Sequence, residues 1–187
     1  MGEGLREGLE ILFIMVLGLI SFGLLAVYLT VTARRFGLPE MISDTYYQLG
    51  KRWGWLFSAV MLAVAVMMLA AILDTGKGVQ CLAFLGCAGL AFVGVAPNYC
   101  DKDAYPVHKG GAMVAALGCM GWAMSVTWWP TVLTITMVAA YLAVIEAYKL
   151  MDSAWYVTRG KTSFRPLYWA EVAGFADVFA TYFAYAA

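Results

Sequence analysis

The stretch that decides the fold is WGWLFSAVMLAVAVMMLAAIL, residues 53–73, which contains no charged residue. Lys51 and Arg52 precede this stretch, and Asp74 follows it. A helix needs about 20 apolar residues to cross the hydrocarbon core of a bilayer. Backbone in lipid must satisfy its own hydrogen bonds, so an apolar run of this length forms a helix and not an open strand. The stretch is therefore predicted to be a membrane-spanning helix.

Similar apolar runs lie on both sides of this stretch and give the predicted architecture. The first run ends at Arg34 and Arg35, and prolines punctuate the later runs, where the first turn of a helix tolerates them. The alternation expected of a barrel strand is absent. The sequence predicts an all-α polytopic transmembrane helix bundle, a single domain over residues 1–187. Its six predicted spans are residues 11–33, 53–73, 79–96, 109–127, 131–148 and 167–187.

The composition supports this class of protein. Hydrophobic residues make up 63% of the chain and charged residues 13%, whereas soluble domains average about 45–50% and about 25%. A soluble fold of this length could not hide so much apolar surface. The formal net charge is zero and no long run of basic residues occurs, so nucleic acid is not an expected partner. The expected partner is the lipid bilayer itself.

The basic residues predict an orientation, because short loops rich in Lys and Arg stay in the cytoplasm. Only Arg6 and Lys77 lie outside the connections after the first, third and fifth runs. We therefore expect a multi-pass protein of the bacterial inner (cytoplasmic) membrane, with its longer loops in the cytoplasm and both termini outside. The basic residues of those loops are Arg34, Arg35, Lys51, Arg52, Lys102, Lys109, Lys149, Arg159, Lys161 and Arg165.

The cysteines and the motif content give no sign of a metal centre or an enzyme. Cys81, Cys87, Cys100 and Cys119 form no CxxC pair and lie mostly within apolar runs, which favours reduced packing residues over a disulfide framework. A single histidine with scattered cysteines does not make a zinc site. The GxSxG, HExxH, P-loop and dinucleotide motifs are absent. No catalytic residue, metal or cofactor is predicted.

Small residues recur at helical spacing in the third and fourth runs. Such stripes let helix backbones approach closely in lipid, where packing must replace the hydrophobic driving force. We therefore expect the third and fourth runs to form a close pair. The residues concerned are Ala83, Cys87 and Ala91 in the third run, and Gly111, Ala115 and Gly118 in the fourth.

Two acidic residues, Glu171 and Asp177, interrupt the sixth run and mark the strongest candidate site. With a helix beginning near Pro166, a rise of 1.5 Å per residue places Asp177 roughly 16 Å along it, near the bilayer midplane. A central aspartate costs on the order of 3 kcal/mol even on lenient scales, so it should face other helices or water. Glu171 lies on a different face. The predicted inward face consists of Ala170, Gly174, Asp177 and Thr181.

Two interpretations of this acidic helix remain open. In the first, Asp177 is a protonatable or cation-binding group of a permeation path, with Thr181 on the same face and Glu171 nearer the cytoplasmic mouth. In the second, Asp177 is a hydrogen-bonded or protonated packing residue, since burial disfavours an unpaired charge. No basic residue lies at a similar depth in any run. A lone deep carboxylate suits a proton or metal cation better than an anionic substrate.

A second candidate site surrounds the only histidine, His108, which stands where the fourth run begins. Asp101 and Asp103 precede it in the same cytoplasmic connection. Together the three could form a proton-responsive or metal-touching cluster at the membrane surface. The alternative is that His108 is a polar cap on the start of the helix.

Short segments of the chain resemble known membrane proteins. PEMISDTYY (residues 39–47) and GWLF (residues 54–57) resemble segments of small uncharacterised membrane proteins of bacteria and their phages. Six spans with a histidine opening the fourth, in VHKGGA (residues 107–112), resemble the DRAM-like six-helix membrane family. The resemblance implies a six-helix layout and supplies no reaction.

Three functional hypotheses follow from the sequence. The leading one is a small channel or transporter component for protons, cations or a small solute, acting alone or as a homo-oligomer. The second is a non-catalytic scaffold whose cytoplasmic loops bind a lipid or a protein partner of unknown identity. The third is a lipid-headgroup enzyme that uses His108 with Asp101 or Asp103.

Overall fold

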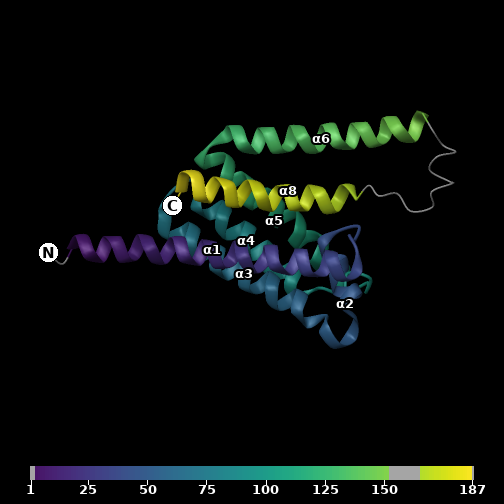
Figure 1. The fold of residues 1–187 in the computed structure, drawn as a ribbon, viewed down its shortest axis with the longest axis horizontal. Helices are drawn as coiled ribbons and strands as arrows, with labels where there is room; N and C mark the ends of the chain where they lie inside the picture. Colours follow the sequence, from purple (N-terminus) through teal and green to yellow (C-terminus); the bar gives the residue numbers. More distant parts are fainter. Residues whose placement is uncertain (1–2, 152–164, 187) are drawn as a thin grey trace.

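The computed structural model describes residues 3–151 and 165–186, and all regular structure in these ranges is helical. The long helices are α1 (Glu3–Phe36), α3 (Trp55–Thr75), α4 (Gln80–Val95), α5 (Ala104–Val126), α6 (Trp128–Met151) and α8 (Pro166–Thr181). They run back and forth as an elongated bundle (Figure 1). Two short helices, η1 (Ile42–Asp44) and α2 (Thr45–Trp53), join α1 to α3, and a π-helical segment, η2 (Tyr182–Ala186), continues α8. The predicted all-helical class is confirmed.

Three helical segments are long and apolar enough to cross a membrane. They are Met15–Phe36 of α1, Trp55–Thr75 of α3 and Trp128–Ala147 of α6. α1 continues through Arg34 and Arg35, where basic side chains suit the negative end of a helix. α4 and α8 have 16 residues each, and α5 is rich in glycine. Among the described residues, α4 and α8 are therefore shorter, and α5 is less apolar, than these three segments.

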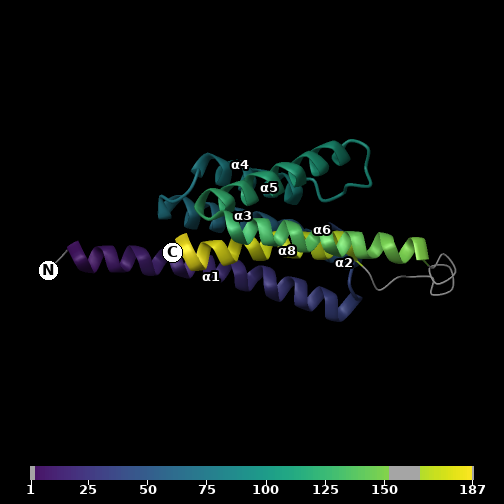
Figure 2. The same ribbon diagram turned by 90° about the horizontal axis from the view of Figure 1, so that it is seen from above.

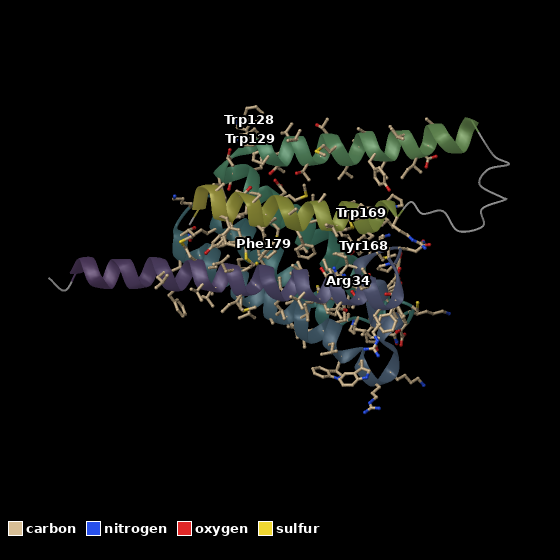
Figure 3. All side chains as sticks on the ribbon, viewed as in Figure 1. Arg34, Trp128, Trp129, Tyr168, Trp169 and Phe179 are labelled. Atoms are coloured by element: carbon tan, nitrogen blue, oxygen red, sulfur yellow. The ribbon has the colours of Figure 1, made fainter. Side chains whose placement is uncertain are left out.

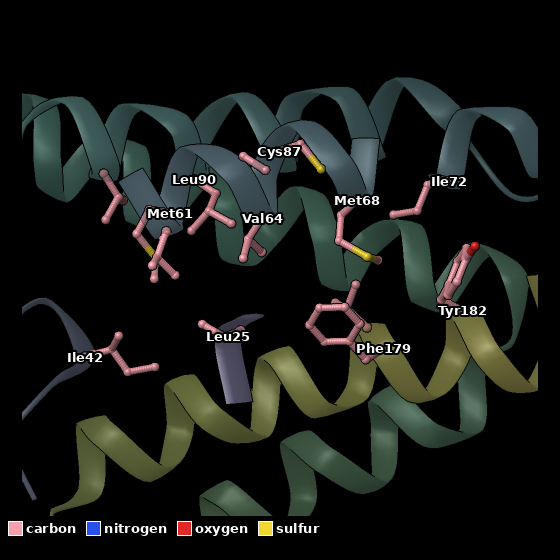
Figure 4. Packing of buried hydrophobic residues seen from close by; sticks show 14 of the residues in the cluster. Leu25, Ile42, Met61, Val64, Met68, Ile72, Cys87, Leu90, Phe179 and Tyr182 are labelled. Carbon is pink, nitrogen blue, oxygen red and sulfur yellow. The ribbon is translucent and has the colours of Figure 1, made fainter. Parts of the chain in front are cut away.

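The core lies around α3, which is apolar on nearly every side. Phe57, Met61, Val64, Met68 and Ile72 recur at helical spacing and are all buried. Figure 4 shows most of them between α4 and the C-terminal helix. Packing in lipid rests on close van der Waals contact, so the fit of these side chains holds the bundle together. Their buried neighbours include Leu25, Cys87, Leu90, Phe179 and Tyr182.

The α4–α5 pair is the most extensive helix contact in the described residues. A methyl group on Gly86 would lie 2.4 Å from the backbone nitrogen of Cys119, and one on Gly89 would lie 2.4 Å from that of Ala115. Only glycine permits an approach this close. The predicted pairing of the third and fourth runs is confirmed. On α4, however, the closest approach is made by Gly86 and Gly89 rather than by the predicted stripe of Ala83, Cys87 and Ala91.

The connections divide between the two ends of the bundle. At one end, Gly76–Val79 joins α3 to α4 and Thr127 joins α5 to α6, and the described termini lie at this end too (Figures 1 and 2). At the other end lie η1, α2 and residues 96–103. Asn98 and the backbone N–H of Cys100 both bind the Tyr47 hydroxyl, each at 2.9 Å. These bonds fasten the 96–103 connection to α2.

The surface of the bundle is largely apolar. Large hydrophobic side chains are exposed along α1, α3, α4, α5 and α6. Trp53 and Trp55 are exposed at the loop end, while Trp128 and Trp129 are exposed where α6 begins, toward the opposite end (Figure 3). Tryptophan at both ends of an apolar surface is typical of membrane proteins. The surface and the three apolar helices suit a membrane location.

Candidate functional site

Asp177 lies on α8 and faces into the bundle, as its sequence neighbours predict. Its exposed fraction is 3%, although α8 packs against α5 and α6 rather than lying at the centre of the molecule. The local sequence explains the burial, because Val178 and Phe179 are also buried and fix the rotation of α8. The Asp177 carboxyl group is therefore buried within the bundle and hardly reaches its outer surface.

Two threonines share this buried region with Asp177. Thr181 stands one turn further along α8 and is fully buried, and Thr131 on α6 has an exposed fraction of 1%. The Thr131 hydroxyl interacts with the Asp177 carboxyl, but no hydrogen bond of normal geometry joins the two. Residues four apart on a helix are neighbours on its surface. The three side chains define an oxygen site between α6 and α8.

Among the described residues, no hydrogen bond of normal geometry is made by any of the four side-chain oxygens of this site. They are both carboxyl oxygens of Asp177 and the hydroxyl oxygens of Thr131 and Thr181. Leaving a buried polar group unpaired costs about 1–3 kcal/mol, and more when the group is charged. Four such atoms from two helices therefore need a partner that the described side chains do not supply in normal geometry.

Threonines elsewhere in the protein avoid this penalty. The Thr32 hydroxyl donates to the Tyr28 carbonyl at 2.8 Å, and the Thr136 hydroxyl donates to the Val132 carbonyl at 2.7 Å. A threonine hydroxyl within a helix commonly donates such a hydrogen bond to a carbonyl of the preceding turn. Thr131 and Thr181 make no such bond to the preceding turn. Their oxygens stay available to another partner.

The chemistry of the site is that of oxygen alone. Carboxylate and hydroxyl oxygens are ligands for hard cations and carriers for protons, whereas imidazole and thiolate select transition metals. Within residues 3–151 and 165–186, no group of three His, Cys, Asp or Glu side chains is arranged to hold a metal. The arrangement can bind a proton or a hard cation.

Glu171 does not join this site. Its Oε2 accepts a hydrogen bond of 2.5 Å from the backbone N–H of Ile42, so the side chain holds η1 against α8. A second contact supports the same junction, because Arg165 pairs with Glu40 at 2.5 Å. The structure thus gives Glu171 a place at the loop end, six residues from Asp177 and in contact with different elements.

His108 is buried, but it does not meet the two aspartates. Its Nδ1 lies 2.8 Å from the carbonyl oxygen of Ala96, at the end of α4, and its ring lies 5.2 Å from that of Tyr99. Asp101 and Asp103 are exposed, and no hydrogen bond or ion pair joins either of them to His108 among the described residues. His108 thus binds a backbone carbonyl at the C-terminal end of α4 and does not cap the start of its own helix, α5.

Sequence reasoning missed several residues with defined roles. Thr131 is one, because its partner lies 46 positions away and only the packing of α6 on α8 brings them together. Asp44 was expected only as a possible helix cap, together with Ser43; it accepts hydrogen bonds from the backbone N–H groups of Glu40 and Met41, each at 3.1 Å, and from the Tyr99 hydroxyl. Burial and this bond to Asp44 both raise the pKa of Tyr99, so its hydroxyl stays protonated and acts as a donor.

No known protein family, curated protein or solved structure matches this chain. The class that the structure itself defines is an all-helical protein with three helices able to cross a membrane. Its most distinctive internal feature is the oxygen site of Asp177, Thr131 and Thr181.

Proposed function

We propose that this protein is a small membrane transporter or channel component that binds a proton or a hard cation at Asp177. The observation that carries the proposal is the set of four buried, unpaired oxygens on α6 and α8. A carboxylate in a region of low dielectric must be neutralised by a proton or paired with a cation. No described basic side chain supplies that partner, so the proton or cation comes from outside the chain.

The same proposal includes a topology in which all six long helices cross the membrane. Their alternation between the two ends of the bundle supports it, as do the exposed tryptophans toward both ends. The basic residues of the loop end favour a cytoplasmic position for that end, with the termini outside. In this orientation the α5–α6 turn faces the outside of the cell.

Oligomerisation belongs to the same proposal. Few side chains of α6 are buried within the chain, so most of its apolar surface is free to face lipid or a second copy. The oxygen site lies on the one side of α6 that does meet the bundle. A homo-oligomer built through α6 would enclose the site further.

The experiment is proton and monovalent cation flux into liposomes that contain the purified protein. Wild type is compared with Asp177→Asn and with Asp103→Asn, which removes the same charge from an exposed position at the loop end. Thermal unfolding confirms that all three are folded. We expect wild type and Asp103→Asn to give equal flux, and Asp177→Asn to fall to the rate of protein-free liposomes.

Two results would contradict the proposal. Flux through Asp177→Asn equal to that of wild type would make Asp177 a packing residue. Absence of flux from folded wild type would instead favour a scaffold, which carries no solute and whose partners bind at the loops.

A further inference from the structure

A groove of about 490 Å³ runs along the outside of the bundle between α1 and α8. Its lining residues recur at spacings of one and three along both helices, so each helix presents one continuous face. Small side chains, Ala26 and Ala33 on α1 and Ala176 on α8, leave the space open. The other lining residues include Phe22, Leu25, Leu29, Val172, Phe175 and Phe179.

The two ends of the groove differ in chemistry. At the inner end, Phe22 meets Phe179 edge to face with ring centroids 5.3 Å apart, which closes the groove. At the loop end lie Arg34, Tyr168 and Trp169 (Figure 3). Arg34 is exposed, and no described carboxylate pairs with it. The apolar groove thus ends at a positive charge that has no carboxylate partner among the described residues, beside two interfacial aromatic residues.

The length of the groove matches half a bilayer. Phe22 and Arg34 are twelve residues apart on α1, which corresponds to about 18 Å at 1.5 Å per residue. One leaflet contributes about half of the roughly 30 Å hydrocarbon core. With Arg34 at headgroup level, the closed end at Phe22 and Phe179 therefore lies near the midplane. A lipid tail that starts at Arg34 would end where the groove ends.

We infer that the α1–α8 groove binds one phospholipid of the loop-side leaflet, with an acyl chain along the groove and its phosphate on Arg34. An arginine fork is well suited to phosphate oxygens. Arg35 adds a second positive charge nearby, and no acidic residue lines the groove. The site should therefore prefer an anionic headgroup such as phosphatidylglycerol over zwitterionic phosphatidylcholine. This inference does not depend on the proposed transport function.

The test is native mass spectrometry of the full chain released from micelles of equal phosphatidylglycerol and phosphatidylcholine. Two matched pairs isolate the two parts of the site. Arg34→Gln removes the lining charge, and Arg35→Gln removes the adjacent charge that does not line the groove. Ala176→Phe fills the groove, and Ala180→Phe places the same ring one turn further along α8, outside the lining. Thermal unfolding confirms that each variant is folded.

We expect wild type to retain one phosphatidylglycerol molecule in preference to phosphatidylcholine. Arg34→Gln should lower this retention about fivefold, the effect of one arginine near an anionic membrane surface, and Ala176→Phe should abolish it. Arg35→Gln and Ala180→Phe should retain most of the lipid. If Ala176→Phe does not fold, the comparison of Arg34→Gln with Arg35→Gln still decides the question.

Three results would overturn the inference. Equal retention of the two lipids would remove the role of charge. Equal losses in Arg34→Gln and Arg35→Gln would show general attraction to the surface rather than a site. A protein dimer that Ala176→Phe dissociates would assign the groove to a second copy of the chain.

Discussion

At the scale of single residues, the hydrogen bonding of the threonine hydroxyls distinguishes the oxygen site from ordinary helix packing. Thr32 and Thr136 give their hydroxyl protons to the preceding turn, while Thr131 and Thr181 beside Asp177 do not. Buried polar groups in proteins are nearly always hydrogen-bonded, so groups without a partner call for an explanation. The oxygen site therefore predicts opposite changes in stability and in activity.

Replacing Thr131 with valine tests whether stability and activity change in opposite directions. Thr131→Val removes an unpaired hydroxyl and keeps the shape of the side chain, so we expect the free energy of unfolding to stay equal or to rise by about 1 kcal/mol. Flux in liposomes should fall, because the site loses a ligand. Thr136→Val on the same helix is the control and should leave flux unchanged. Wild-type flux through folded Thr131→Val would contradict a ligand role for its hydroxyl.

Glu171 has a different predicted effect, because its carboxylate holds η1 and not a solute. Glu171→Ala leaves the Ile42 N–H without its acceptor and should lower the free energy of unfolding by about 1–3 kcal/mol. Glu171→Gln keeps an oxygen acceptor and should lose less. Both folded variants should keep wild-type flux. A loss of flux in Glu171→Gln as large as in Asp177→Asn would place Glu171 in the path after all.

At the scale of elements, the sequence predicted where helices lie better than where they begin. Helix α5 begins at Ala104 rather than residue 109, and α6 begins at Trp128 rather than residue 131. In both cases a proline, Pro106 or Pro130, stands in the first turn, where its missing N–H is no loss. The small-residue pattern also identified α4 and α5 as partners. It did not identify the face of α4, because small residues occur on more than one side of that helix.

The α4–α5 contact predicts unequal effects of alanine at two glycines of α5. A methyl group on Gly118 would lie 2.5 Å from the backbone nitrogen of Gly86, whereas one on Gly110 meets nothing within 4 Å. Gly118→Ala should force the helices apart and destabilise the protein by about 1–3 kcal/mol. Gly110→Ala should be neutral or stabilising by up to about 1 kcal/mol, from helix propensity alone. Thermal unfolding in detergent compares the two, and equal melting temperatures would contradict the observed packing.

At the scale of the whole molecule, the alternation of long and short connections was predictable, and the oxygen site was only half predictable. Hydropathy and basic residues give the order of helices directly, since both are local properties of the chain. Asp177 was recognisable because an acidic residue within an apolar run is rare. Thr181 was recognisable because it lies on the same predicted helix face as Asp177. Thr131 was not, because its role depends on how α6 and α8 pack. The groove beside Arg34 depends in the same way on the packing of α1 and α8.

The proposed topology predicts which side of the membrane each end of the bundle faces. Cys100 is exposed at the loop end, and Lys77 lies in the short connection at the opposite end. A membrane-impermeant maleimide should label native Cys100 only when it has access to the cytoplasmic face. In a cysteine-free background, Lys77→Cys should be labelled only from outside. Labelling of both positions from one side would contradict the six crossings.

The most direct test of the central claim asks whether the Asp177 carboxyl takes up and releases its partner. Carbodiimides modify protonated carboxylic acids in apolar surroundings, and mass spectrometry locates the modified residue without knowledge of the transported solute. In wild type reconstituted into liposomes, we expect modification at Asp177 that slows as pH rises or as a bound cation displaces the proton. Modification of Asp177 that is indifferent to pH and to cations, or none at all in folded protein, would contradict an exchanging site.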